Sequence, residues 1–397
     1  MARSTPPLRL AIVSTYPPRR CGIAAYTSEL RAALRSLSPE PQVDIIAVDW
    51  DGLPYDEEVV AVVEPGNPAS YLAAVDVLAD RNTTAVLIQH EYGREYGVSG
   101  DADRHGTNLV TLARAAAAHG LPHAVTLHTV PSRSTDAHRQ LLGEMCADAA
   151  LVTVFTRTAR DIVQELGIVH TNRLAVIPHG APEALWTAPD PRPLRPELAE
   201  LVGAGPVVAT FGLIGAAKGL EIGIDAVARL IDRHPGLRYV IAGQTHPEVI
   251  RRYGETYRSQ LVDQVSRLGL SEHVRFINAF LGVDEIAALL RRTTVFLTPY
   301  RSAEQTSSGV LTFALACGRP VVSTAYQYAQ ELLASGAGLL VPCDDPAALA
   351  ASLDQLLSDR SAREHSNAVA RQVGAELAWP TVARLLSTAL NGIASGA

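Results

Sequence analysis

The fold is decided by the stretch PVVATFGLIGAAKGLE, residues 206–221. It opens with an apolar run, Pro206 to Thr210, which is typical of a strand buried on both faces of a parallel sheet. A loop with three glycines and a lysine follows, from Gly212 to Gly219, and a helical pattern begins after it. The stretch therefore predicts a strand, a glycine-rich loop and a helix in immediate succession.

Lys218 in this loop is the only lysine of the chain; the other 33 of its 34 lysine and arginine residues are arginines. Helix N-termini attract anions, and an ammonium group adds a compact positive charge there. The position therefore predicts a phosphate ligand. A lone cation on a solvated loop is the alternative, because most loop cations are solvated.

The same alternation of apolar runs and helical patterns recurs along the chain. Helical patterns such as those at 24–37 and 107–118 separate several of the apolar runs. Further strand-like runs are expected at 10–14, 43–48, 85–89, 124–127, 151–154, 174–177, 239–242, 274–276, 295–297, 320–323 and 339–341. Alternation of this kind predicts an α/β fold with doubly wound parallel sheets.

The length and one proline-rich stretch indicate two domains. The 397 residues exceed what a single hydrophobic core usually supports, and six prolines in 182–206 indicate a linker. We expect a Rossmann-like domain over 1–185, a second over 205–375, and a C-terminal helix over 376–397 that packs back on the first domain. The two domains are expected to face each other across a cleft.

Composition narrows the class of function. A net charge of -7 disfavours broad nucleic-acid binding, which needs a basic face. Four scattered cysteines show no metal-binding or disulfide spacing, which suits a reducing cytosol. Neither a signal-type apolar region nor a run of 18 apolar residues occurs. We expect a cytoplasmic protein with neither a nucleic-acid partner nor a transmembrane segment.

Ligands of parallel sheets bind at the carboxyl ends of the strands. The candidate site therefore consists of the residues that follow the predicted strands: Gly22, His90-Glu91, His128, His179-Gly180, Lys218, Gln244 and the loop 298–309. Neutral imidazoles can donate to or accept from sugar hydroxyls, whereas a hydrogen-bonded structural role is the alternative for each histidine. A zinc site would need a third well-placed ligand, and none is readable, so no metal is predicted.

A second candidate site lies at the start of another helix, where the sequence reads TSSGVL at 306–311. Small hydroxyl residues and Gly309 leave backbone N–H groups there for an anion or a sugar. Simple N-capping is the alternative, since any helix uses it. The preceding Glu304 and Gln305 add polar groups beyond what capping requires.

Four stretches, in the right order over most of the chain, resemble the family-4 glycosyltransferases, the retaining GT-B group. They are STYPPRRCGIA at 14–24, VIPHG at 176–180, the glycine-rich loop at 211–219, and ALACGRPVV at 314–322. The resemblance implies a GT-B fold and transfer of a sugar from a nucleotide-diphosphate donor to a small-molecule or glycan acceptor. It also implies retention of configuration, no metal and no other cofactor.

The resemblance assigns roles by position. Gly22 would lie near the donor phosphate and the acceptor, His128 would contact the transferred sugar near the reacting carbon, and Lys218 would stabilise the leaving diphosphate. The acceptor side is expected to include Arg19, His90 and Glu91, and the donor side Gln244. The leaving phosphate itself would take the acceptor proton, so the expected mechanism needs no dedicated protein base.

The sequence departs from the family pattern at the donor site. Relatives often carry an arginine five residues before the lysine, where this chain has Leu213. The usual pair of glutamates, eight positions apart, falls on Gln305 and Phe313. Glu304, one residue out of register, is the carboxylate expected to substitute for the first glutamate and is the third catalytic candidate.

These replacements change the expected donor contacts. Phe313 cannot accept hydrogen bonds from ribose hydroxyls, so we expect weak ribose anchoring and a donor that can be non-standard. Gln305, Ser308 and Gly309 are expected to contact the donor phosphate or sugar through neutral groups and helix N–H donors.

Two other enzyme activities and one non-enzymatic function stay open. A sugar-nucleotide epimerase or a phosphorylase would share the two-domain architecture and differ in whether an added acceptor is glycosylated. A catalytically inactive sugar-phosphate sensor would keep the scaffold, and the missing acidic pair favours it. A homodimer is compatible with all of these functions.

Overall fold

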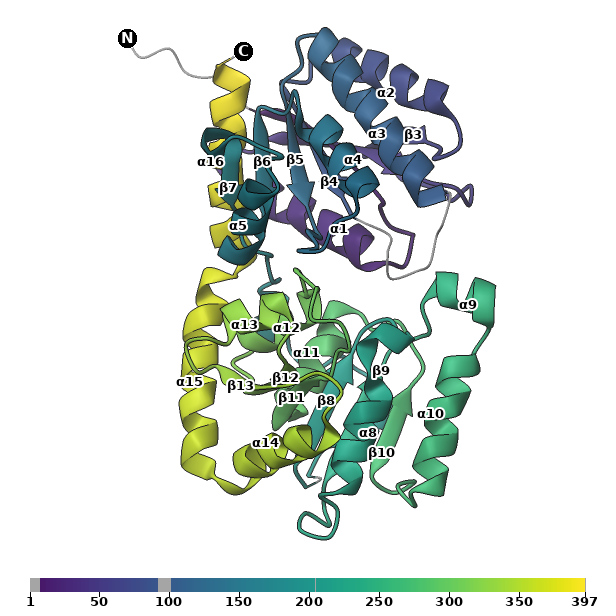
Figure 1. The fold of residues 1–397 in the computed structure, drawn as a ribbon, viewed down its shortest axis with the longest axis vertical. Helices are drawn as coiled ribbons and strands as arrows, with labels where there is room; N and C mark the ends of the chain where they lie inside the picture. The colour runs from purple at the N-terminus through teal and green to yellow at the C-terminus, as the bar shows by residue number, and fades with distance from the viewer. Residues whose placement is uncertain (1–7, 92–100, 204, 397) are drawn as a thin grey trace. The chain divides into compact units, whose positions relative to one another are not determined.

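The computed structural model describes residues 8–91, 101–203 and 205–396, with only the backbone described for 101–105. It divides into two compact units (Figure 1). The first unit comprises Met1–Gly180 together with Trp379–Ala397, and the second comprises Ala181–Ala378. Among the described residues, no helix is both long and apolar enough to cross a membrane.

The first unit is built on a seven-stranded sheet in the order β3-β2-β1-β4-β5-β6-β7, and every pair of neighbours is parallel. Its strands are β1 (Arg9–Ser14), β2 (Gln42–Val48), β3 (Val59–Val63), β4 (Ala85–His90), β5 (His123–Leu127), β6 (Leu151–Val154) and β7 (Leu174–Val176). Its helices are α1 (Gly22–Arg35), α2 (Pro68–Asp80), α3 (Asp101–Ala118), α4 (Asp136–Cys146), α5 (Arg157–Glu165), the 3-10 helix η2 (Thr171–Arg173) and α16 (Trp379–Ser395).

The second unit is built on a six-stranded parallel sheet in the order β10-β9-β8-β11-β12-β13. Its strands are β8 (Val207–Phe211), β9 (Arg238–Ala242), β10 (Val274–Ile277), β11 (Val295–Thr298), β12 (Val321–Thr324) and β13 (Gly338–Val341). Its helices are α6 (Ala184–Thr187), α7 (Pro196–Ala199), the 3-10 helix η3 (Ala216–Lys218), α8 (Leu220–Ala228), α9 (Pro247–Tyr253), α10 (Thr256–Arg267), α11 (Val283–Arg292), α12 (Gly309–Ala316), α13 (Gln327–Leu332), α14 (Pro346–Ser358) and α15 (Arg360–Glu376).

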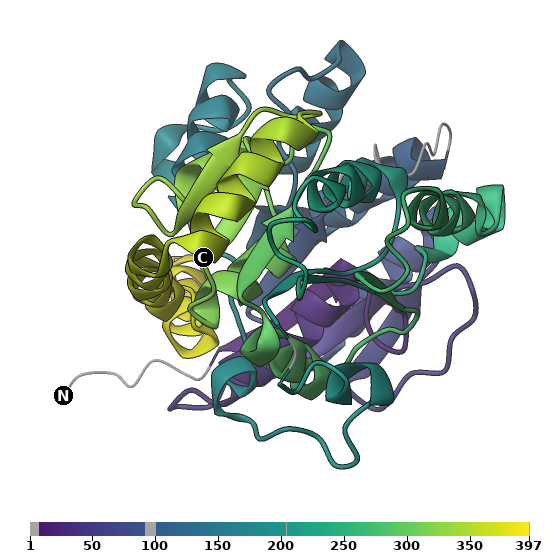
Figure 2. The same ribbon diagram turned by 90° about the horizontal axis from the view of Figure 1, so that it is seen from below.

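Helices cover both faces of each sheet (Figures 1 and 2). In the first unit, one core lies between the sheet and α2 to α5, where Tyr71, Leu112 and Val125 are fully buried. In the second unit, α8, α10 and α14 form the corresponding core with Leu261 and Leu353. Each such aliphatic side chain stabilises the fold by about 1.5–3 kcal/mol when removed from water, which is why the strands consist of continuous apolar runs.

The predicted α/β class with two parallel sheets is confirmed. The stretch 182–206, expected as a linker, instead packs on the second unit. Its Asp190 carboxylate accepts from Arg292 Nη2 at 2.6 Å and also pairs with Arg291, both on α11. Arg195 Nε donates to Glu285 on the same helix at 2.7 Å. The prolines correctly indicated irregular backbone in this stretch. Ion pairs nevertheless hold that irregular backbone against α11.

Both sheets contain one point at which the strand order reverses. In the first sheet it lies between β1 and β4, and in the second between β8 and β11. Loops that leave two neighbouring strands in opposite directions open a crevice at their carboxyl ends, and doubly wound proteins bind ligands there. The topology therefore directs attention to the loops after β1, β4, β8 and β11.

Helix α16 completes the first unit by packing against α1. Trp379 at its start is 3% exposed, and its Nε1 donates to Glu29 Oε2 on α1 at 2.9 Å. A Cβ atom added at Gly180 would collide with the Trp379 indole, so only glycine permits this close approach. Burial raises the pKa of the Glu29 carboxyl to about 7.

The raised pKa of Glu29 makes the stability of the first unit depend on pH. The folded state binds more protons than the unfolded chain between the ordinary value of 4.5 and about 7. The contribution of the neutral carboxyl is therefore full below the ordinary value and is lost as pH rises through about 7. We expect Glu29→Gln, which stays neutral, to be more stable than the wild type at about pH 8 by up to ~3 kcal/mol.

Urea unfolding of both proteins between about pH 4 and pH 8 measures this difference. Comparing the two proteins cancels the titration of the buried histidines, whose depressed pKa values act in the opposite direction. A difference in unfolding free energy that does not vary with pH would show that the pKa of Glu29 is not raised in the folded state.

Candidate functional site

The glycine-rich loop after β8 places Lys218 at the reversal point of the second sheet. Lys218 ends the short helix η3, and Gly219, with φ of 58°, links it to α8. A Cβ atom at Gly219 would collide with the Pro299 carbonyl oxygen, so the loops after β8 and β11 approach closely there. Glycine is therefore required at this position both for its left-handed backbone and for space.

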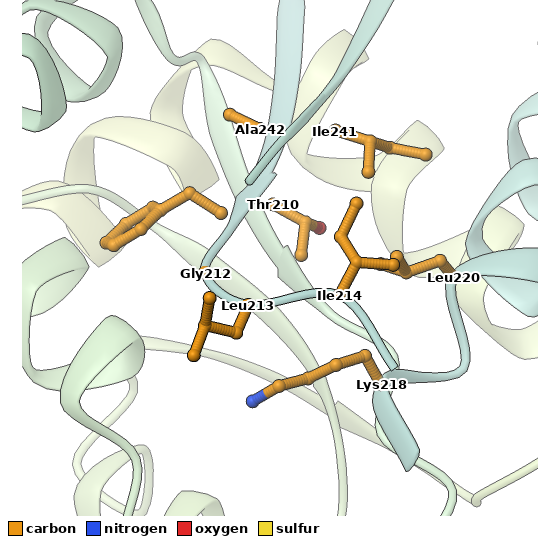
Figure 3. Close-up of a pocket in the computed structure, with 9 residues that line it drawn as sticks. Thr210, Gly212, Leu213, Ile214, Lys218, Leu220, Ile241 and Ala242 are labelled. Atoms are coloured by element: carbon orange, nitrogen blue, oxygen red, sulfur yellow. The ribbon is translucent and has the colours of Figure 1, made fainter. Parts of the chain in front are cut away.

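A small hollow, partly open to solvent, lies beside this loop (Figure 3). The residues that line it are Thr210, Phe211, Gly212, Leu213, Ile214, Lys218, Leu220, Ile241 and Ala242. Lys218 is the only charged residue in this lining. Its side chain extends from the loop past Leu213 in the view of Figure 3. The hollow thus combines an apolar wall with one ammonium group.

The loop after β9 supports the glycine-rich loop. The amide of Ile214 donates to the Gln244 carbonyl oxygen at 2.9 Å, so Gln244 is tied to the loop through its backbone. The buried Arg258 anchors the loop that follows β9, because its Nη2 donates to the Gly243 carbonyl oxygen at 2.6 Å. A Cβ atom at Gly243 would collide with the Gly212 carbonyl oxygen.

Lys218 Nζ donates to the hydroxyl of Tyr300 at 2.9 Å and lies 4.2 Å from the centre of its ring. Burial, and secondarily the Lys218 charge, lower the pKa of His246 to about 4. His246 is therefore neutral at physiological pH, and the ammonium supplies the positive charge here. Tyr300 lies in the predicted loop 298–309, but no local pattern indicated that Tyr300 or His246 would be a neighbour of the lysine.

The second donor candidate is the segment from Glu304 to the start of α12. Ser308 caps this helix, its hydroxyl accepting from the Leu311 amide at 3.4 Å, which is the capping role considered as the alternative. Gln305 Nε2 donates to the Ser307 carbonyl oxygen at 2.9 Å, and both Glu304 and Gln305 are half-buried. Gly309 is the first residue of the helix.

Phe313 lies on the same helix, one turn further on. Its ring centre is 6.4 Å from that of Phe211, which lines the hollow. Phe313 therefore contributes to an aromatic pair, and its side chain has no polar atom to offer a ribose.

In the first unit, Gly22 opens α1 directly after the loop that follows β1. Cys21 caps the helix, with Sγ accepting from the Ala24 amide at 3.4 Å. A Cβ atom at Gly22 would meet nothing within 4 Å. Backbone N–H groups at the start of a 14-residue helix can bind an anion.

Three histidines gather at the carboxyl ends of β4, β5 and β7. The His128 amide donates to the His90 carbonyl oxygen at 2.9 Å, and the His128 ring Nε2 is 2.7 Å from Gln89 Oε1. The rings of His128 and His179 both lie 4.9 Å from that of Tyr26 on α1. The structure therefore brings the candidate residues His90 and His128 close together, but His128 is only 4% exposed to solvent.

Burial keeps His128 and His179 neutral. It holds the pKa of His128 well below its usual range, with smaller contributions from His179 and His90, and lowers the pKa of His179 to about 4. If His128 Nε2 carries the proton donated to Gln89, the other ring nitrogen is an acceptor. A neutral imidazole of this kind can orient a sugar hydroxyl without carrying charge.

Arg19, which was predicted to contact the acceptor substrate, forms ion pairs within the first unit. Its Nη2 donates to Asp49 Oδ1 and to Asp51 Oδ2, each at 2.8 Å, and its guanidinium lies 3.7 Å from the centre of the Trp50 ring. Hydrogen bonds from the Leu53 amide and from Arg19 outweigh burial and lower the pKa of Asp49. The structure thus places Arg19 beside β2, in an ion-pair cluster of its own.

Two family profiles match successive parts of the chain. Residues 21–184 match the profile described as Glycosyltransferase Family 4, and residues 205–359 match the profile described as Glycosyl transferases group 1. The chain belongs to the family-4 glycosyltransferases. The resemblance noted in the sequence is thereby confirmed.

Several relatives share the name D-inositol 3-phosphate glycosyltransferase. This glycosyltransferase is 28% identical over 388 residues to the one from Frankia alni, a match that covers 91% of this chain and 92% of the relative. It is 26% identical over 361 residues to that from Acidothermus cellulolyticus, covering 82% and 72%. The match to the Corynebacterium efficiens relative is 32% identical over 223 residues, but it spans only half of that protein's length and 55% of this chain.

Solved structures confirm the GT-B fold. Anabaena HepE, solved in complex with UDP, has a TM-score of 0.73 at 17% identity and covers 97% of this glycosyltransferase and 100% of that chain. Sucrose-phosphate synthase from Thermosynechococcus elongatus has a TM-score of 0.75 at 16% identity, with coverage of 98% and 100%. At such identities the likeness shows the fold alone.

In the part of this glycosyltransferase that the structure describes, no group of three or more histidine, cysteine, aspartate or glutamate side chains could hold a metal ion. Tyr300 lies within the predicted loop 298–309, but its bond to Lys218 was not predicted. Tyr26 and Trp379, which lie around the candidate histidines, were not predicted. The signal for Tyr300 was its place two residues after β11 at the reversal point. Trp379 gave no local signal, because it reaches the site region from the far end of the chain.

We expect His128→Ala to lower kcat of this glycosyltransferase by about 10²-fold while leaving nucleoside-diphosphate affinity within about threefold, because Lys218, the charged phosphate candidate, lies in the second unit. Steady-state kinetics and ligand titration measure the two effects. His123→Ala is a matched control, since His123 is equally buried but lies at the opposite end of the same strand, β5. Equal losses of kcat in both variants would show that His128 acts through packing and not by contact with the sugar.

Proposed function

We propose that the protein transfers a glycosyl group from a nucleotide-diphosphate sugar to a small acceptor with retention of configuration. The observation that carries this proposal is the ammonium of Lys218 beside a hollow at the reversal point of the second sheet. A fixed positive charge stabilises negative charge that develops on a leaving diphosphate, and it acts most strongly where water is excluded. Membership of the glycosyltransferase family supports the same reaction class.

In the proposed mechanism the leaving diphosphate lies against Lys218 and the N-terminus of α8. Helix N–H groups and the ammonium together share its charge. The departing phosphate oxygen takes the proton of the acceptor hydroxyl on the same face of the sugar, so neither a protein base nor a metal ion is needed. Retention follows because the acceptor attacks from the face that the leaving group vacates.

The first unit is proposed to hold the acceptor and to contact the transferred sugar. Neutral His128, together with His90 and Glu91 at the end of β4, offers hydrogen-bonding groups to hydroxyls. The N-terminus of α1 at Gly22 can accept a phosphate or a partial negative charge. A hydroxyl-rich acceptor such as a sugar or a cyclitol, with or without a phosphate, fits these groups.

The donor nucleotide is proposed to be anchored weakly at its ribose. Phe313 packs near Phe211, so a carboxylate is absent where relatives place one. Glu304, half-buried before α12, is the carboxylate proposed to address a sugar hydroxyl, and Gln305 and Ser308 offer neutral contacts. Binding then depends on the diphosphate more than on the nucleoside.

A thermal-shift screen tests this function directly. A ligand that binds only the folded state raises the apparent melting temperature in proportion to RT ln(1 + [L]/Kd). We expect UDP, GDP or ADP and a matching sugar nucleotide to stabilise the protein, and the corresponding nucleosides to do so far less. No stabilisation by any nucleoside diphosphate or sugar nucleotide would contradict the proposal. Stabilisation without turnover in the presence of acceptors would favour a sensor.

A further inference from the structure

We propose that Tyr300 is a positioning residue that holds the Lys218 ammonium in its diphosphate-binding place. The inference rests on the proposed function, since it concerns how that site is built. Tyr300 follows β11 and Lys218 follows β8, and these strands are neighbours at the point where the order of the second sheet reverses. The pair therefore bridges the two loops that flank the predicted binding crevice.

The contact between the two side chains defines the direction of the hydrogen bond. An ammonium group has only donors, so the Tyr300 oxygen accepts from Lys218 Nζ at 2.9 Å. The same nitrogen lies 4.2 Å from the ring centre, within range of a cation–π attraction. Both interactions favour the charged lysine. A phenol adds no negative charge of its own, so this contact does not neutralise the ammonium.

Tyr300 is itself fixed by its surroundings. Its ring is fully buried and stacks on Tyr326, with centres 4.9 Å apart and planes at 20°. Its carbonyl oxygen accepts from Thr324 Oγ1 at 2.7 Å. The Arg301 amide next to it donates to the Ala217 carbonyl oxygen at 3.2 Å, which ties the β11 loop to the lysine loop. A rigid acceptor of this kind reduces the rotamer entropy that a flexible lysine would lose when a ligand binds.

Neighbouring cations do not duplicate the lysine. Arg301 Nε donates to Glu221 Oε1 at 2.6 Å, and Arg258 is occupied by the Gly243 carbonyl oxygen. The hollow has Lys218 as the single charged residue of its lining. Because one ammonium must serve a multiply charged diphosphate, the position of that ammonium has a large effect on affinity.

The test is a double-mutant cycle between Tyr300 and Lys218. Tyr300→Phe keeps the ring and its stack but removes the acceptor oxygen, and we expect it to weaken binding of UDP, GDP or ADP about fivefold. Affinity for the matching nucleoside should not change, since a nucleoside has no phosphate to meet the lysine. In the Lys218→Ala background, Tyr300→Phe should have no further effect, because it acts through the lysine.

Tyr328→Phe serves as the control. Tyr328 is equally buried, and its hydroxyl bonds to Thr312 Oγ1 at 2.6 Å, away from Lys218. We expect this variant to lose stability but to keep diphosphate affinity. Wild-type affinity in Tyr300→Phe, or an equal loss for diphosphate and nucleoside, would overturn the positioning role alone. If the wild type itself binds none of UDP, GDP and ADP, the proposed function fails with it.

Discussion

Lys218→Ala is expected to lower kcat/KM for the sugar nucleotide by about 10²- to 10³-fold, the range found when one preorganised group that stabilises transition-state charge is removed. The loss arises because the ammonium is the single charged group lining the hollow, so a leaving diphosphate would keep only helix N–H groups. Nucleoside-diphosphate affinity should fall in parallel. Steady-state kinetics with varied sugar nucleotide, together with calorimetric titration, measure both effects.

Lys218→Arg is the matched variant for this prediction. Arginine keeps the charge but presents a planar fork in place of a compact ammonium, so it cannot reproduce the bond to the Tyr300 oxygen in the same geometry. We expect partial recovery of kcat/KM. Kinetics in Lys218→Ala that match the wild type would remove Lys218 from the site.

Trp379→Ala is expected to destabilise the first unit by about 3–5 kcal/mol, the usual cost of deleting a large buried aromatic side chain. The indole is 3% exposed, contacts the ring of Tyr26 at 5.2 Å between centres, and donates to the half-buried Glu29. Truncation leaves a cavity and removes the hydrogen bond that this half-buried carboxyl accepts. The far end of the chain thereby loses its main attachment to α1.

Trp186→Ala is a matched control, because Trp186 is 39% exposed and should cost less than about 1 kcal/mol. Urea unfolding followed by circular dichroism measures both variants without relying on tryptophan fluorescence. A chain with two units can show two transitions, and only that of the first unit should move. Equal effects of the two substitutions would mean that α16 is not held through Trp379.

The sequence predicted the strands of both sheets because nearly all are continuous apolar runs in parallel sheets. Strand β3 (Val59–Val63) was not predicted. It is an edge strand whose residues are mostly only half-buried, so its pattern is weak. The prolines at 182–206 predicted a linker, but in the structure ion pairs hold this stretch to α11. Such pairs join residues about a hundred positions apart and leave no local trace.

The candidate site was predictable in position but not in detail. Residues directly after strands can be located from the alternation alone, which is why Lys218, His90 and His128 were found. Their surroundings depend on tertiary contacts between distant elements: Tyr300 lies 82 positions from Lys218. The ion pairs of Arg19 with Asp49 and Asp51 likewise join distant positions, and its expected place near the acceptor stays a prediction.

The central claim is that the protein transfers a sugar from a nucleotide-diphosphate donor with retention. Its most direct test is to incubate the protein, in the presence of EDTA, with UDP-glucose, UDP-N-acetylglucosamine or GDP-mannose and a panel of cyclitols, cyclitol phosphates and sugars. Proton NMR then identifies the anomeric configuration of any product, and chromatography counts the nucleoside diphosphate released. We predict an α-linked glycoside from one of these α-linked donors, with one nucleoside diphosphate released per glycoside. A β-linked product, an epimerised donor, or release of no nucleoside diphosphate with any donor and acceptor would contradict it.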